Sequence, residues 1–344
     1  MKQDWKLPFF AIWSGQALSL LGSNVAGFAL VWWLTKSTGS ATVLATTMLV
    51  MMLPGIILGP FAGALVDRWN RRLVMIVADG FVALVSAWLA YLALTGALQV
   101  WHVYVIMLAR SAGGVFHWPA MQASTSLMVP KEQLSRVAGM NQMLQGAMTI
   151  VAPPLGALLI SIIPFYAVMG MDVITATLAI LPLFFVFIPQ PARQAAAGRA
   201  TSLWQDMGEG FRYVRAWPGL LMIMAMATVI NLLLHPAFSL LPILVTKHFG
   251  GQALELGWIN SAWGIGVVAG GLILSAWGGF RRRYVTSMLG LIGMGAGILL
   301  LGLAPGAAFG LALGAMLLAG LMNPICNGPL MAMMQAQVAP EMQG

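Results

Sequence analysis

The chain has 344 residues, of which 60% are hydrophobic and only 8% are charged, and its mean hydropathy is +0.88. A soluble protein of this size with this composition would have too few polar residues to cover its surface. The composition therefore excludes a soluble globule and places the chain in a bilayer. In a soluble protein, a net charge of +8 would suggest binding to nucleic acid. Here the basic residues lie in short segments between apolar runs, so we expect no nucleic-acid partner.

Apolar runs of about 20 residues, long enough to cross the hydrocarbon as helices, recur along the chain. Interrupting them at charges, Pro/Gly clusters and polar turns gives ten predicted transmembrane helices. Their ranges are 9–34, 41–66, 73–95, 101–122, 137–163, 167–188, 217–246, 257–278, 285–303 and 307–330. We predict an all-α membrane protein, because lipid offers the backbone no partner outside the segment itself and no alternating barrel pattern is present.

The basic residues are distributed unevenly between the two sides of this predicted bundle. If the N-terminus is cytoplasmic, 14 of the 17 Lys and Arg fall on that side, and only Lys36 and Lys247 lie in outer loops. The positive-inside rule therefore predicts a multi-pass protein of the bacterial cytoplasmic membrane with its N-terminus inside. The 14 residues are Lys2, Lys6, Arg68, Arg71, Arg72, Lys131, Arg136, Arg193, Arg199, Arg212, Arg215, Arg281, Arg282 and Arg283.

The longest polar interval divides the chain into two parts. We predict a six-helix bundle over residues 1–188, a cytoplasmic central loop over 189–216, and a C-terminal bundle of four helices over 217–344. Within the loop, Ser202 is a candidate N-cap for a short amphipathic helix whose apolar face includes Leu203 and Phe211, so we expect that helix to lie on the membrane surface.

The second part of the chain echoes the first. Arg71 and Arg72 correspond to Arg282 and Arg283 at an offset of 211 residues, and two further pairs of segments match at offsets of 209 and 210. These are "MVPKE" (128–132) with "QVAPE" (337–341), and Pro119 and Met121 with Pro329 and Met331. Ordered matches at a nearly constant offset predict two homologous halves, the usual construction of a transporter with its substrate path between them. Six spans precede the loop and four follow it, so the second copy is incomplete.

A charged turn follows the second predicted span. The stretch "GALVDRWNRRLVMIVADG" (63–80) holds five ionisable residues. We expect Gly63 to allow close approach of a neighbouring helix, and Asp67 to accept charge-assisted hydrogen bonds. Arg68, Arg71 and Arg72 can donate to carboxylates, helix C-termini or lipid phosphates. Such a cluster could act as a gate that stabilises one conformation.

These residues resemble the G-x-L-x-D-R-x-G-R-R motif of the major facilitator superfamily, with Asn70 at the second glycine. We expect Asn70 to be tolerated there because Asn adopts the left-handed backbone more readily than most residues. The counterpart "GGFRRRYV" keeps its arginines but has Gly278 in place of the aspartate. The resemblance extends over nearly the whole chain and implies alternating access between two helical bundles.

Two further motifs carry the resemblance. "RSAGG" (110–114) is similar to the family's R-x-x-Q-G, with Gly113 replacing Gln, and the run from Gly146 through "APPLGA" resembles the family's antiporter motif. Its helix-packing residues here are Gly146, Pro153, Pro154 and Gly156. Together with "WSGQALSLLGS" and "GFRYVRAWPGL", these residues look most like the macrolide-efflux-type branch, whose members are proton-driven exporters of amphipathic compounds.

Ionisable side chains inside spans cost several kcal/mol unless they are partnered, which singles out Asp79 and Arg110 as candidates for proton coupling. Each could instead be a fixed structural charge, and for Asp79 we favour a structural or gating role. Asp172 lies near the outer end of its span, and we expect it to be solvated.

Neutral polar residues inside the spans are candidates to line a central cavity, although interhelical hydrogen bonding would explain each almost as well. We select five because they lie in the first, fifth and seventh spans, which line the cavity in this superfamily. They are Gln16, Asn24, Asn141, Gln145 and Asn231.

The sequence contains no phosphate-binding loop, no paired Cys or His ligands and no nucleophile elbow, so we expect no cofactor, no metal and no enzymatic activity. The predicted function is proton-coupled efflux of an amphipathic small molecule by a monomer in a lipid bilayer. A lipid or siderophore exporter, or an importer, remains the alternative within this fold. A truncated, transport-incompetent membrane protein is the alternative outside it.

Overall fold

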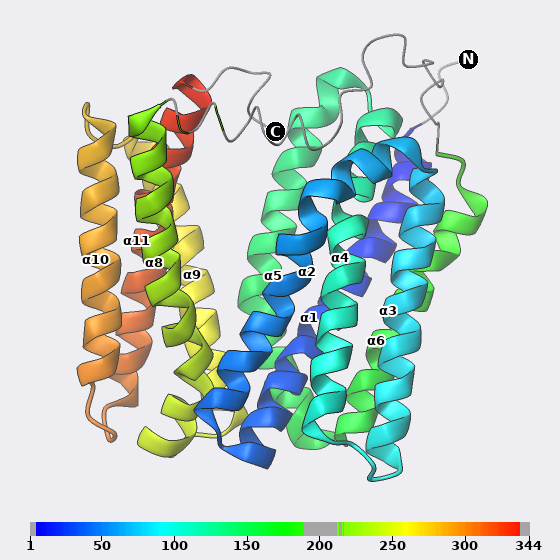
Figure 1. Ribbon diagram of the computed structural model, residues 1–344, viewed down its shortest axis with the longest axis horizontal. Coiled ribbons are helices and arrows are strands. Elements are labelled where there is room, and N and C mark those ends of the chain that lie inside the picture. The colour runs from blue at the N-terminus through cyan, green and yellow to red at the C-terminus, as the bar shows by residue number, and fades with distance from the viewer. Residues whose placement is uncertain (1–4, 189–211, 213–214, 216, 338–344) are drawn as a thin grey trace. The chain divides into compact units, whose positions relative to one another are not determined.

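The computed structural model describes residues 5–188, 212, 215 and 217–337, and every regular element in these ranges is helical (Figure 1). The chain divides into two compact units, residues 1–148 with 155–197 and residues 149–154 with 198–344. The first unit holds α1 (Lys6–Thr38), α2 (Ala41–Arg68), α3 (Arg71–Leu94), α4 (Val100–Met128), η1 (Lys131–Gln133), most of α5 (Leu134–Ile162) and α6 (Phe165–Phe185). The second unit holds α8 (Pro218–Ile243), the π-helical turn η2 (Leu244–His248), α9 (Ala253–Trp277), α10 (Arg283–Leu303) and α11 (Phe309–Gln337).

Local signals set the helix ends. Ser40 and Asn70 cap α2 and α3, because their side-chain oxygens accept hydrogen bonds from the backbone N–H groups of Val43 and Leu73. Gly39 and Gly278 end α1 and α9 in the left-handed region, at φ of 56° and 76°. These positions explain why the chain turns where the apolar runs stop.

Nine helices within the described residues are long and apolar enough to cross a membrane. The ten predicted spans correspond to these nine and to α4, which contains Arg110 and His117 among its 29 residues. One pair of corresponding helices in the two units agrees in both length and offset. α4 and α11 are both 29 residues long and begin at residues 100 and 309, a separation of 209 residues.

The predicted end of the fourth span, at residue 122, was wrong by six residues, because α4 continues to Met128. The added turns contain Ser124, Thr125 and Ser126, whose hydroxyls donate to backbone carbonyls three or four residues earlier in the same helix. Self-satisfied hydroxyls let a polar sequence remain helical beyond the apolar run.

The two units are packed differently. In the first, α6 lies against α1 and α3, while α4 lies against α2 and α3, around large apolar side chains such as Ile12, Met75 and Leu183. In the second, α11 lies between α9 and α10 (Figure 1). Gly270 of α9 and Gly290 of α10 both face the backbone of α11, at Leu321 and Cys326. Close backbone packing through small residues is how helices associate in lipid.

Candidate functional site

A buried ion pair joins four helices inside the first unit. Nη1 of Arg110 on α4 bonds Oδ2 of Asp172 on α6, and the two side chains are 13% and 0% exposed. The hydroxyl of Ser86 on α3 donates to Asp172 Oδ2 at 2.7 Å and accepts from Arg110 Nη1 at 2.6 Å. Ser23 on α1 donates to Asp172 Oδ1 at 3.0 Å, and its carbonyl accepts from Arg110 Nη2 at 3.2 Å. Both oxygens of the carboxylate are therefore satisfied.

The expectation that Asp172 is solvated was wrong. Asp172 is seven residues into α6, on the same buried stripe as Val168, Met169 and Ala176. At about 1.5 Å per residue it lies roughly 10 Å from the start of its helix, and Arg110 lies roughly 15 Å from the start of α4. The long arginine side chain covers this difference in depth. The serines then supply the donors that a buried carboxylate needs.

A second buried carboxylate lies on α3. Asp79 Oδ2 accepts a hydrogen bond of 2.8 Å from the Gln16 amide on α1, and Asp79 Oδ1 is 3.3 Å from Nε2 of His117 on α4. The Asp79 and His117 side chains are 11% and 20% exposed. The carboxylate and the imidazole are within ion-pair distance, but the ring N–H is not aligned as a hydrogen bond. This pair therefore has looser geometry than Arg110 and Asp172.

Sequence reasoning singled out Asp79 and Arg110 but missed their partners. His117 is seven residues after Arg110, two helical turns further along the same face of α4, and this spacing was the available signal. Ser23 and Ser86 offered none, because serines inside membrane helices commonly bond their own backbone. The two candidates do not pair with each other.

Removing the Ser86 hydroxyl should destabilise the first unit measurably. In Ser86→Ala, the charged side chains of Arg110 and Asp172 each lose their hydrogen bond to the Ser86 hydroxyl but stay in the protein interior. We therefore expect the free energy of unfolding to fall by about 1.5–3 kcal/mol. Thermal unfolding of the purified protein in detergent measures this loss. Ser37→Ala is the matched control, because Ser37 is exposed and bonds only carbonyls of its own helix. Equal midpoints for the two variants would contradict a stabilising role for Ser86.

The predicted gating residues lie at the α2–α3 turn. Arg72 Nη2 donates to the carbonyl of Phe184 at the end of α6, at 2.7 Å, as expected for an arginine binding a helix C-terminus. Arg71 is buried at the first position of α3, and Arg68 is exposed at the end of α2. The side chain of Asp67 lies outside the described residues. The gating role of these residues stays a prediction.

Two expectations for this turn were wrong. No helix of the first unit lies close to Gly63, because a Cβ placed there would meet nothing within 4 Å. Asn70 is not left-handed: its φ is −69° and it caps α3 through Leu73 N–H. An Asn at this position is useful for its side-chain oxygen rather than for its backbone freedom. In the counterpart turn, Gly278 ends α9 in the left-handed region. A residue with a side chain would be strained in that backbone conformation.

The other predicted residues are dispersed. Gly156 is buried where α5 approaches Phe28 of α1, and Pro153 and Pro154 lie inside α5, as does Gly146. Among the cavity candidates, Gln16 bonds Asp79, Asn141 accepts from Trp13 Nε1 at 2.8 Å, and Asn24 bonds the Leu20 carbonyl in its own helix. Gln145 is partly buried and Asn231 is exposed on α8. Their cavity roles stay predictions. The predicted surface helix after Ser202 lies outside the described residues, except for Arg212 and Arg215.

Comparison with known proteins agrees with this architecture. Residues 12–344 match the family described as the Major Facilitator Superfamily. The chain belongs to this superfamily. It is 33% identical over 341 residues to macrolide efflux protein A of Streptococcus pyogenes, covering 99% of this chain and 84% of that protein. A second protein of that name, from Enterococcus faecalis, is 31% identical over 306 residues, covering 89% and 94% of the two chains.

A solved structure extends the likeness of fold. A bacterial homologue of the human lysosomal transporter Spinster superposes with a TM-score of 0.71 at 13% identity, covering 99% of this chain and 77% of that one. The chain is thus a multi-pass membrane transporter, and within its described residues six α-helices precede residue 189 and four follow residue 217.

Proposed function

We propose that this transporter exports an amphipathic small molecule of the macrolide type in exchange for protons, as a monomer in the bacterial cytoplasmic membrane with its N-terminus inside. The relatives named macrolide efflux proteins support the substrate class. The distribution of Lys and Arg supports the orientation. The single observation that carries proton coupling is the presence of two buried carboxylates with different surroundings in one unit.

Asp172 is the fixed member of this pair of sites. It holds four helices together through Arg110, Ser23 and Ser86, and both of its oxygens are occupied. Protonating it would leave the Arg110 guanidinium without its counter-charge inside the bundle. Such a loss is expensive inside the bundle, so Asp172 is poorly suited to exchange a proton during transport.

Asp79 is the exchanging member. It faces the imidazole of His117, a group that can take up and release a proton, and a neutral amide on α1. When one proton binds, the net charge of Asp79 with His117 changes from −1 to zero. A change of charge inside the membrane can shift the equilibrium between the two conformations of a transporter. The elements packed against α3 contribute the neighbouring charges Arg110 and Asp172, which neutralise each other.

Transport into inside-out membrane vesicles tests the proposed function. We expect accumulation of a macrolide when the vesicle lumen is made acidic, and collapse of that accumulation when a protonophore is added. The panel includes hydrophobic dyes and siderophores, because a siderophore exporter of the same fold would accumulate only the latter. Accumulation that ignores the proton gradient would overturn proton coupling.

Replacing Asp79 or His117 should uncouple transport from the gradient. We expect Asp79→Asn and His117→Gln to reduce gradient-driven accumulation about 5- to 150-fold, the range that coupling free energies of 1–3 kcal/mol produce. Exchange of labelled for unlabelled macrolide without a gradient should survive, because substrate exchange requires no net movement of protons. His235→Gln is the control, since His235 is exposed on α8. Equal loss of exchange and gradient-driven transport would assign the pair a structural role instead.

A further inference from the structure

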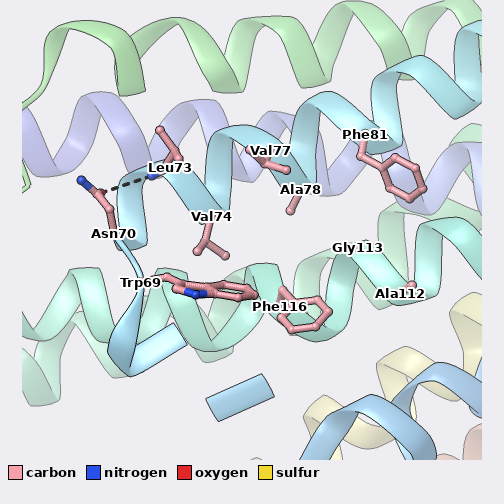
Figure 2. A pocket seen from close by; sticks show the side chains of 10 residues that line it. All are labelled: Trp69, Asn70, Leu73, Val74, Val77, Ala78, Phe81, Ala112, Gly113 and Phe116. Atoms are coloured by element: carbon pink, nitrogen blue, oxygen red, sulfur yellow. Dashed lines mark hydrogen bonds between the residues drawn. The ribbon is translucent and has the colours of Figure 1, made fainter. Parts of the chain in front are cut away.

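A groove of about 510 Å³ runs along the outside of the first unit between α3 and α4. Leu73, Val74 and Val77 line its α3 side, and Phe116 with the small residues Ala112 and Gly113 lines its α4 side. Trp69 closes one end, with its ring tilted 31° to that of Phe116 at a centroid separation of 6.3 Å (Figure 2). The volume is within the range of small-molecule sites.

The packing of the helices explains why the groove exists. α2 and α3 both pack along α4 but scarcely contact each other, so the face of α4 between them is left open. Ala112 lines the groove with only a methyl group, and Gly113, buried against Val82 of α3, adds no side chain. The groove is therefore built into the helix arrangement.

The groove lies on the outer face of the first unit rather than in its interior. Leu73 and Val77 are each 61% exposed and Phe81 is 44% exposed, whereas Met75 and Asp79 on the opposite face of α3 are buried. α3 is one of the helices apolar enough to cross the membrane. Leu73 to Phe81 extends about 12 Å along the helix, most of one leaflet of hydrocarbon about 30 Å thick. An acyl chain lying in the groove would match this depth.

The end of the groove lies beside basic residues of the α2–α3 turn. Trp69 and Asn70 line it, and they stand between Arg68 and Arg71 in the α2–α3 turn. Arg71 and Arg72 occupy the first two positions of α3, and the first turn contains no acidic residue. Cations at a helix N-terminus add to the positive end of the helix dipole, an unfavourable arrangement that a bound anion relieves. The exposed Arg68 is directly beside Trp69.

We propose that an anionic phospholipid binds here, with one acyl chain in the groove between α3 and α4 and its phosphate at the turn formed by Arg68 to Arg72. Charge complementarity selects this occupant. A cationic amphipathic compound would meet the exposed Arg68 and the positive end of the α3 dipole at this end of the groove, and a zwitterionic lipid would gain less from them. The site lies on the opposite face of α3 from Asp79, so it is independent of the proposed proton exchange.

Trp69 fluorescence reports occupation of the groove. The full chain is reconstituted into nanodiscs containing phosphatidylcholine with increasing fractions of phospholipid brominated on its acyl chains, either phosphatidylglycerol or phosphatidylcholine. The Trp69→Phe variant keeps an aromatic ring beside Phe116, and subtracting its emission isolates Trp69 from the other tryptophans. We expect half-maximal quenching of Trp69 fluorescence at a fraction of brominated phosphatidylglycerol about fivefold lower than that of brominated phosphatidylcholine. This is the gain in affinity typical of one basic residue at a membrane surface.

Two variants separate the chain site from the headgroup site. Arg68→Gln should remove most of the preference for the anionic lipid while leaving quenching at high lipid fractions. Ala112→Phe should fill the groove and reduce quenching by both lipids. Arg281→Gln, which removes an exposed arginine at the corresponding turn of the second unit, should change neither. Equal half-maximal fractions for the two lipids in the unaltered chain would overturn the proposal, as would displacement of the lipid by a macrolide or unchanged quenching in Ala112→Phe.

Discussion

Arg110→Ala is expected to abolish gradient-driven efflux and to lower the free energy of unfolding by about 3–5 kcal/mol, because it leaves a charged carboxylate buried without its partner. Asp172 is 0% exposed, and the two serine hydroxyls that remain cannot neutralise it. The chain should still insert into the membrane, since nine of its helices are apolar enough without α4. Thermal unfolding in detergent and drug accumulation in inside-out vesicles measure the two effects.

The double variant Arg110→Met with Asp172→Leu distinguishes stability from mechanism. Replacing both charges by apolar side chains of similar volume removes the uncompensated charge, so we expect most of the lost stability to return. If efflux also returns, the pair serves only to hold α1, α3, α4 and α6 together. If efflux remains absent in a stable protein, Arg110 has a part in the conformational cycle. Full activity of Arg110→Ala itself would remove the residue from both roles.

Much of the helical framework could be predicted because hydropathy and charge act over whole segments. An apolar run such as residues 73–95 can satisfy its backbone in lipid only as a helix, and α3 occupies Arg71–Leu94. The arginines expected in the turns before the third and ninth spans lie at the helix starts instead: Arg71 and Arg72 are the first residues of α3, and Arg283 begins α10 after its N-cap Arg282.

The site was harder to predict because side-chain partners depend on which helices are neighbours. Asp172 looked solvated from its distance to the helix end, but α6 packs against α1 and α3, which bring Ser23 and Ser86 to it. His117 was overlooked although its seven-residue spacing from Arg110 puts both residues on one face of α4, because nothing in the sequence showed that His117 lies beside Asp79 of α3. For Gly63, the presence of glycine suggested a close contact, yet a glycine can also face open space.

Tight glycine packing in the second unit leads to the other large effect that we expect. Gly270 of α9 is buried against α11, and a Cβ added to it would collide with the carbonyl oxygen of Leu321. Backbone atoms cannot rotate away as a flexible side chain can, so α9 and α11 would have to separate along their contact. We expect Gly270→Ala to lower the free energy of unfolding by about 3 kcal/mol or more, at the upper end of the usual cost of overpacking.

Gly271→Ala, at the adjacent position in the same helix, is the matched control. A Cβ at Gly271 would meet nothing within 4 Å, so the substitution adds the same methyl group without a collision. It should be neutral or stabilise the protein by up to about 1 kcal/mol, because alanine favours a helix more than glycine does. Thermal unfolding of the two variants in the same detergent gives the comparison. Midpoints that fall equally would mean that general features of α9, rather than its contact with Leu321, set the stability of the second unit.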